Sequence, residues 1–471
     1  MGAMFVQIPG NAKFLRAAAA SISGIQGDGE VSSSGGVLRR SVASSHSFSI
    51  SAISQAGETP LALIADGRPF DAVIVYGDGN SAALVESLEQ LDGAIAMRNC
   101  AIGSVSRSNV LAAESSPGML MTVEMGATAS EITEVKLGDL SPTLSVGGGE
   151  TVVAVDVYGE RVAALSVANA NAGKHQVNLH LYDGAEWRLI SVGEYTPLSE
   201  PTGYRVAWCH DNKRALVVCQ RGLVYLMASL VDLDGRITAV RTPYAEILSI
   251  RHGRHLYVGF SNGVVSRLEG KKLVQVANAP AGTYTAMALS SSGDGFVFCS
   301  ETGIIVLDAY NRPSAQVAPA AGSALLDIRL GEASGAAVDR NGNVYLKDSK
   351  LSPWRTATTI TGGGSSPVVV AAQISWPLMV ASVEVAVTPA ATSVNAGTAP
   401  PFCTEKATVV MASLDGAHWI EVPRFDKGPP EDRGPIFAVS TAGGKVVAGG
   451  LRRWPMGATR LLKFDGVVLA A

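Results

Sequence analysis

Charged residues are scarce in this chain of 471 residues, and Lys and Arg form no block along it. Charged residues make up 17% of the chain, against about 25% in typical soluble domains. The formal net charge is only −4. Proteins that follow the phosphate backbone of nucleic acids need a basic patch. We therefore predict no sequence-specific binding of nucleic acid.

Cysteine is also rare, and no C-x-x-C pair occurs. The five cysteines are Cys100, Cys209, Cys219, Cys299 and Cys403. Cys209, Cys219 and Cys299 follow apolar runs that are typical of strands. We expect buried free thiols rather than disulfides, which favours synthesis in a reducing cytoplasm.

A targeting or membrane segment is not evident in the sequence. The first ten residues have no basic cluster before their apolar residues, and Arg16 interrupts the next apolar run, so no secretory signal is predicted. The stretch Val368–Ala391 has about the length of a membrane span. It contains Gln373 and Glu384, however, and Trp376-Pro377 is typical of a turn between two strands. We predict no membrane insertion.

Motifs of common catalytic and cofactor sites are absent: there is no Walker loop, no G-x-S-x-G elbow and no G-x-G-x-x-G after a strand. Asp339-Arg-Asn-Gly-Asn-Val-Tyr345 is faintly similar to a calcium loop, but its twelfth position is Lys350 rather than Glu, so a hairpin turn is expected. The seven histidines have no zinc spacing: they are His46, His175, His180, His210, His252, His255 and His418. We expect no catalytic residues, no cofactor and no metal.

Glycine, in contrast, is abundant, and four glycines recur at a nearly constant step. Gly222, Gly263, Gly303 and Gly342 are 41, 40 and 39 residues apart, each between two short apolar runs. A tight hairpin there needs a positive φ, which glycine adopts without strain. A period of roughly 40–45 residues with four strands per repeat is typical of a β-propeller.

A second set of turns recurs in phase with these glycines. Asp183-Gly184, Asp234-Gly235, Asp415-Gly416 and Asp465-Gly466 fall between the third and fourth apolar runs of their modules. Asp-Gly favours a two-residue hairpin turn, because both central positions take a positive φ. We predict seven modules, which begin near Val152, Tyr204, Glu246, Thr285, Leu325, Val368 and Ile436.

The predicted fold class is all-β: a propeller of about seven blades with a β-rich N-terminal region and an extended N-terminal arm. The arm covers residues 1–45 and the propeller residues 149–471. Residues 46–148 are either further blades or a small docked domain. The turn-rich segment Thr388–Pro401 is expected to be a loop inserted between strands of the sixth module.

Two of the turns carry a tryptophan: Asp183-Gly-Ala-Glu-Trp187 and Asp415-Gly-Ala-His-Trp419, the latter preceded by Ser413-Leu. They resemble the Ser-x-Asp-Gly-x-x-Trp turns of repeat β-proteins, including bacteriophage tail proteins. They are also similar to the Asp-box of sialidase-type propellers, which has one more residue between Asp and Gly. In both families the motif is a structural hairpin remote from the catalytic centre. We expect the Asp to cap turn amides and the Trp to cover the outer sheet face.

Three arginines are relevant to the hypothesis of a sialidase-like hydrolase. Such an enzyme would need arginines, a Tyr nucleophile and acid–base carboxylates in the central channel. Arg205, Arg251 and Arg329 each fall in the first apolar run of a module, which lines the channel in a propeller. No tyrosine stands out beside them. We favour solvated channel residues over a substrate site, since charged residues are rarely buried unpaired.

The loose repeats and the Asp-Gly-x-x-Trp turns resemble those of tail-associated propellers in bacteriophage virions. The resemblance implies a non-enzymatic structural or interaction protein of a large assembly, such as a tail, nozzle or hub component located in the virion. Its partners would be other copies of itself, as a homo-oligomer, and neighbouring assembly proteins. A mean hydropathy of +0.23 agrees, because exposed apolar patches mark interfaces. The alternatives are a carbohydrate-active propeller (lectin or sialidase-like glycosidase) and a cytoplasmic scaffold for a protein partner.

Overall fold

The structure is a computed structural model of the chain, and its regular elements are all strands. It describes residues 3–7, 14–25, 28–33, 36–41, 45–55, 70–77, 94–110, 120–135, 137–169, 174–195, 203–243, 245–290, 295–300, 303–317, 324–330, 335–347, 353–361, 367–385, 407–424, 434–456 and 461–471. In these ranges no helix has the length and apolarity that crossing a bilayer requires. The all-β prediction is confirmed for this part of the chain.

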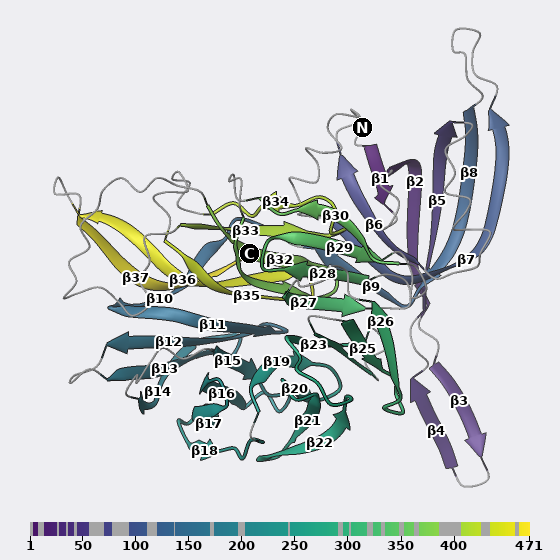
Figure 1. Cartoon of the computed structure of the whole chain (residues 1–471). Coiled ribbons are helices and arrows are strands. Elements are labelled where there is room, and N and C mark those ends of the chain that lie inside the picture. The colour runs from purple at the N-terminus through teal and green to yellow at the C-terminus, as the bar shows by residue number, and fades with distance from the viewer. Residues whose placement is uncertain are drawn as a thin grey trace. The chain divides into compact units, whose positions relative to one another are not determined.

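The chain divides into two compact units (Figure 1). Unit 1 comprises Met1–Leu137 with the short pieces Gly331–Gly335 and Lys347–Ser352, and unit 2 comprises the rest. The division falls at Leu137 rather than at residue 148 because strand β10 (Ser141–Gly148) pairs with the last strand of the chain, β37 (Leu461–Ala470).

Unit 1 contains a seven-stranded antiparallel sheet of order β6-β1-β2-β5-β8-β7-β9, in which β6 also pairs with β7. Its strands are β1 (Ala3–Gln7), β2 (Phe14–Ile25), β5 (Ser45–Gln55), β6 (Phe70–Gly77), β7 (Ala94–Val110), β8 (Leu120–Ala129) and β9 (Glu131–Val135). A separate hairpin joins β3 (Asp28–Ser33) to β4 (Gly36–Ser41). The predicted arm over residues 1–45 does not describe β1 and β2, because neighbouring strands are hydrogen-bonded to both edges of each.

Unit 2 contains seven four-stranded antiparallel sheets. Six follow chain order: β11–β14 (Glu150–Tyr158, Arg161–Asn169, His175–Tyr182, Trp187–Tyr195), β15–β18 (Gly203–Trp208, Arg214–Arg221, Val224–Asp232, Ile237–Ala239), β19–β22 (Ile247–His252, Leu256–Phe260, Val264–Glu269, Lys272–Asn278), β23–β26 (Ala286–Leu289, Phe296–Cys299, Gly303–Leu307, Pro313–Val317), β27–β30 (Leu325–Leu330, Gly335–Asp339, Asn343–Lys347, Arg355–Thr359) and β31–β34 (Val369–Ile374, Met379–Glu384, Thr408–Ser413, Ile420–Glu421). The seventh has the order β10-β37-β36-β35, with β35 at Ile436–Ala442 and β36 at Lys445–Met456.

The predicted module starts agree with the first strands of these sheets to within two residues. Gly222, Gly263 and Gly342 have φ values of 52°, 87° and 80° and lie between the second and third strands of their sheets. The Asp-Gly turns at Gly184 and Gly416 lie between the third and fourth strands, with φ values of 104° and 76°. The periodic turns therefore place the strands as the sequence predicts.

The turn predicted at Asp465-Gly466 is wrong. Both residues lie inside β37, where Leu451 of β36 pairs with Gly466 and Arg452 pairs with Asp465. A Cβ atom on Gly466 would lie 2.7 Å from the carbonyl oxygen of Glu150. Gly466 is required for this close approach of two backbones rather than for a positive φ.

Each first strand of unit 2 packs against the first strand of the next sheet, in the order β11, β15, β19, β23, β27, β31 and β35, and β35 packs against β11. Apolar side chains fill the spaces between neighbouring sheets; Trp208, for example, is completely buried between the first and second sheets. Burial of this apolar area is the main stabilising contribution. Cys209, Cys219 and Cys299 are free and buried in these layers, as predicted, and Cys100 is free and buried in unit 1.

Two further predictions concern the sixth sheet. The turn at Trp376-Pro377 is confirmed, because β31 and β32 pair antiparallel on either side of it. The insertion Thr388–Pro401 and Cys403 lie outside the described residues.

Candidate functional site

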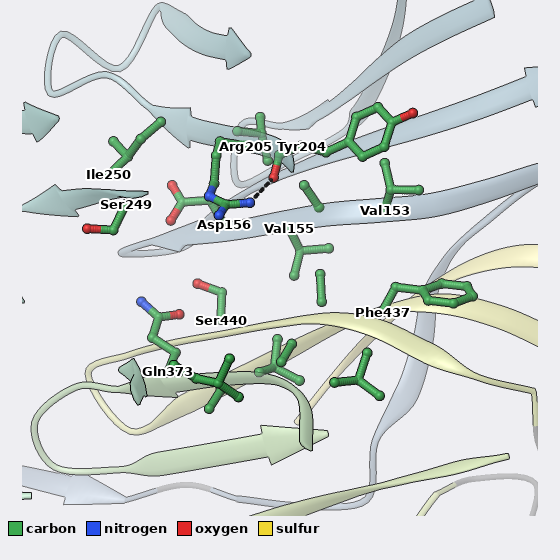
Figure 2. Close-up of a pocket in the computed structure, with 18 of the residues that line it drawn as sticks. Val153, Val155, Asp156, Tyr204, Arg205, Ser249, Ile250, Gln373, Phe437 and Ser440 are labelled. Atoms are coloured by element: carbon green, nitrogen blue, oxygen red, sulfur yellow. Dashed lines mark hydrogen bonds between the residues drawn. The ribbon is translucent and has the colours of Figure 1, made fainter. Parts of the chain in front are cut away.

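The first strands of unit 2 line an open cavity of about 270 Å³. It is lined from six of the seven sheets, by β11, β15, β19, β27, β31 and β35. Figure 2 shows Arg205 and Ser249 on one side of this space and Gln373 and Ser440 on the other. The sequence prediction that Arg205 and Arg251 line a channel agrees with this placement.

Polar side chains tie neighbouring first strands together around the cavity. At six junctions a side chain forms a hydrogen bond with the main chain of the next first strand. Four side chains accept a main-chain N–H: Ser440 Oγ from Val157 (3.2 Å), Asp156 Oδ2 from Trp208 (2.9 Å), Asp327 Oδ2 from Ile374 (2.6 Å) and Gln373 Oε1 from Thr441 (3.0 Å). Two side chains donate to a main-chain carbonyl: Arg205 Nη2 to Leu248 (3.3 Å) and Ser249 Oγ to Met287 (2.7 Å). At the seventh, Ser290 and Leu330 form a main-chain bridge. Buried main-chain groups need such partners.

A buried ion pair joins two strands that are not neighbours. Arg251 Nη2 of β19 donates to Asp327 Oδ1 of β27, and Arg251 Nε donates to the Met287 carbonyl at 3.3 Å. Asp327 is completely buried, and its carboxylate also accepts the N–H groups of Ile328 and Ile374. Burial raises the pKa of Asp327, and the Arg251 guanidinium and the two amides oppose that rise.

The other two arginines differ in their surroundings. Arg205 lies against the cavity, and its guanidinium donates to the carbonyl oxygens of Tyr204 and Leu248. Burial lowers the pKa of Arg205, with a smaller opposing effect from Glu246. Arg329 does not line the cavity; its guanidinium lies over the Trp376 ring, 5.4 Å from the centroid.

Three aromatic rings and a carboxylate form a cluster that the sequence did not reveal. Tyr158 stacks on His210 and on His252, with centroids 4.8 Å and 4.6 Å apart. His252 Nε2 lies 2.9 Å from Asp156 Oδ2. The rings come from the ends of three successive first strands. This shared position within the repeat is the sequence feature that could have indicated the cluster. No zinc spacing could show it, because the residues are more than 40 positions apart.

The two histidines extend a chain of close polar contacts from Asp156. His210 Nδ1 lies 3.2 Å from the Arg254 carbonyl, and His210 Nε2 lies 3.3 Å from His252 Nδ1. Burial and the neighbouring His252 lower the pKa of His210.

The Asp-containing turns are structural, as predicted. Asp415 Oδ1 accepts the N–H groups of Ala417 and His418 at 2.9 Å and 2.8 Å, and Trp419 packs against the core of its sheet. Asp183 likewise accepts from two amides of its turn, at 3.0 Å and 3.1 Å.

The loop at Asp339 is a hairpin turn rather than a calcium loop. Both oxygens of Asp339 accept hydrogen bonds from its own hairpin, including those from the Asn343 N–H and the Tyr345 hydroxyl. In the described part of the chain, no group of three or more His, Cys, Asp or Glu side chains is arranged to hold a metal ion.

The comparisons with known proteins give likenesses in structure only. No protein-family model and no curated protein matches the chain. Among solved structures, the chain is similar to the computationally designed protein Ika8, with 12% identity and a TM-score of 0.37 over 69% of this chain and 99% of the other. It is also similar to a catalytically inactive variant of virginiamycin B lyase from Staphylococcus aureus with quinupristin, with 9% identity and a TM-score of 0.39 over 77% of this chain and 99% of the other.

Proposed function

We propose that the seven sheets of unit 2 are the blades of a closed propeller, and that the chain is a non-enzymatic structural component of a large assembly. Two features support closure. The packing of first strands returns from β35 to β11, and β10 completes the sheet formed by the last three strands of the chain. Joining the first strand of the propeller to the last sheet would lock the ring with main-chain hydrogen bonds.

The polar groups around the cavity support a structural role. Asp156, Asp327, Gln373 and Ser440 each hold a main-chain N–H of the neighbouring sheet. Side chains used in this way fix the sheets relative to one another. A rigid propeller is a suitable scaffold for contacts with other proteins.

The observation that carries the proposal is a set of exposed apolar side chains on the third and fourth strands of three consecutive sheets. Leu189 of β14 is 63% exposed, Val224 of β17 55%, Ile237 of β18 42% and Val274 of β22 37%. The first two sheets meet at this rim, since a methyl group on Gly235 would lie 3.9 Å from Ile190. Single exposed apolar residues are ordinary, but a group on adjoining elements marks an interface.

We propose that a second copy of the chain covers this rim, giving a homo-oligomer that also binds neighbouring proteins of the assembly. The Asp-Gly-x-x-Trp turns and the repeat architecture make a tailed-bacteriophage virion the proposed setting, with the protein made in the host cytoplasm and then built into the particle. The proposal includes neither sequence-specific binding of nucleic acid nor membrane insertion.

The test is the native mass of the purified chain. We expect an oligomer, and the double variant Val224→Lys with Ile237→Lys should shift it to a monomer, because two buried charges would face apolar surface. Tyr310→Lys is the matched control: Tyr310 is 79% exposed, on the turn between β25 and β26 of a sheet outside the rim. A wild-type chain that stays monomeric at all concentrations contradicts the proposal.

The alternative is a carbohydrate-active propeller, and the Asp156–His252–His210 network beside the cavity favours it. A carboxylate and an imidazole within hydrogen-bond distance are groups that could move a proton. Release of nitrophenol from a panel of nitrophenyl glycosides, lost in Asp156→Asn but kept in the control Tyr310→Lys, would support this alternative over the structural role.

A further inference from the structure

We propose that the cavity inside the first strands binds a small oxyanion, a carboxylate or a phosphate, through Arg205, Gln373 and Ser440. The three residues come from β15, β31 and β35 and line the same space (Figure 2). The site is independent of the proposed role in an assembly.

The charges around the cavity leave one arginine unmatched. Asp327 forms an ion pair with Arg251, and Asp156 Oδ2 lies 2.9 Å from His252 Nε2. No carboxylate of the described residues forms an ion pair with Arg205, whose printed contacts are all carbonyl oxygens. Burial lowers the pKa of Arg205, yet a guanidinium keeps its charge in proteins. The Arg205 guanidinium is therefore a positive charge on the cavity wall that forms no ion pair among the described residues.

Two polar side chains of the lining, Gln373 and Ser440, have hydrogen-bond donors available beside this charge. Gln373 Oε1 faces the Thr441 N–H, which can only donate, so the NH₂ group of the Gln373 amide remains available. Ser440 Oγ accepts the Val157 N–H, which leaves its O–H to donate. Arg205 uses Nε and one N–H on each terminal nitrogen for carbonyl oxygens, so two of its five N–H groups remain.

An oxyanion is the ligand that satisfies such a lining. Carboxylate and phosphate oxygens only accept, and a guanidinium binds them with geometry suited to its planar fork. A cation would be repelled by Arg205, and an apolar molecule would leave these donors without partners. A volume of about 270 Å³ suits a small ligand rather than a polymer.

The experiment is calorimetric titration of the full chain with sodium phosphate and, separately, sodium acetate, in chloride buffer at constant ionic strength. We expect saturable binding with one site per chain, and the more tightly bound probe identifies the class of oxyanion. Arg205→Met should weaken binding about tenfold or more, as expected for loss of a charge-assisted contact. Gln373→Glu keeps an oxygen for the Thr441 N–H but replaces the free donor with a negative charge, so it should abolish binding.

The matched control is Arg241→Gln, which removes an exposed positive charge from the same unit and should leave binding unchanged. Circular dichroism establishes that each variant is folded. If Arg205→Met does not fold, the wild-type titration and Gln373→Glu decide the question. Absence of saturable binding of both probes by the wild type, or equal affinity in folded Gln373→Glu, overturns the proposal.

Discussion

Breaking the ion pair between Arg251 and Asp327 by removing one partner should strongly destabilise unit 2, although the two residues lie 76 positions apart. Asp327 has no exposed surface, and the Arg251 side chain is 16% exposed. Removing one partner of a buried pair leaves an uncompensated charge and costs about 3–5 kcal/mol. Asp327→Asn keeps one side-chain oxygen that can accept the N–H of Ile328 or Ile374. We therefore expect its free energy of unfolding to fall by about 3 kcal/mol, at the lower end of that range.

Arg251→Met should be destabilised in a pH-dependent way. Burial already raises the pKa of Asp327 in the folded chain, and without the opposing guanidinium this pKa rises further above its unfolded value. A buried acid of this kind takes up a proton as the pH falls. The free energy of unfolding of Arg251→Met should therefore increase on lowering the pH through that raised pKa, and decrease at higher pH.

The double variant Arg251→Met with Asp327→Asn removes both charges, so it should lose much less stability than the two single losses added together. The assay is urea unfolding of all four proteins, followed by tryptophan fluorescence at several pH values. The reasoning is refuted if both single variants lie within about 1 kcal/mol of wild type, or if the effects add without coupling.

Three further predictions follow from packing and from titration. Gly450→Ala should lower the free energy of unfolding in urea by about 1–3 kcal/mol, because its Cβ would lie 2.7 Å from the Ile436 Cα. Gly138→Ala, whose Cβ would meet open space, should have the free energy of unfolding of the wild type. Cys219, whose pKa burial raises to about 12, should react with a thiol reagent only after unfolding; fast reaction of the native chain at this residue would contradict its burial. The hydrogen bond to Asp415 raises the pKa of His418 above the usual 6.5. The contribution of this hydrogen bond to the free energy of unfolding should therefore be complete below pH 6.5, and it should be lost as the pH rises through the raised pKa of His418. Melting temperatures against pH should show this dependence in wild type and not in a variant without the Asp415 carboxylate.

The sequence predicted the strands of unit 2 because their turns are local. A positive φ at Gly222 or Gly263 is a requirement of the hairpin itself, and Asp183 and Asp415 satisfy amides two or three residues away. Such interactions repeat with the chain and can be read from spacing. Asp465-Gly466 shows the limit of predicting turns from local sequence. The same two residue types lie here inside a strand, at a point where another backbone approaches closely.

The sequence by itself determined that the described part of this chain is all-β, where its seven modules begin, and that Gly222, Gly263 and Gly342 turn hairpins, because those features depend on neighbours a few residues apart. Only the tertiary structure decided which polar side chains meet. Asp156 finds Trp208 and His252, and Arg251 finds Asp327, because equivalent strands of successive sheets lie side by side around one cavity. Contacts between residues 40 to 100 positions apart depend on the packing of whole sheets, and no local pattern records that packing.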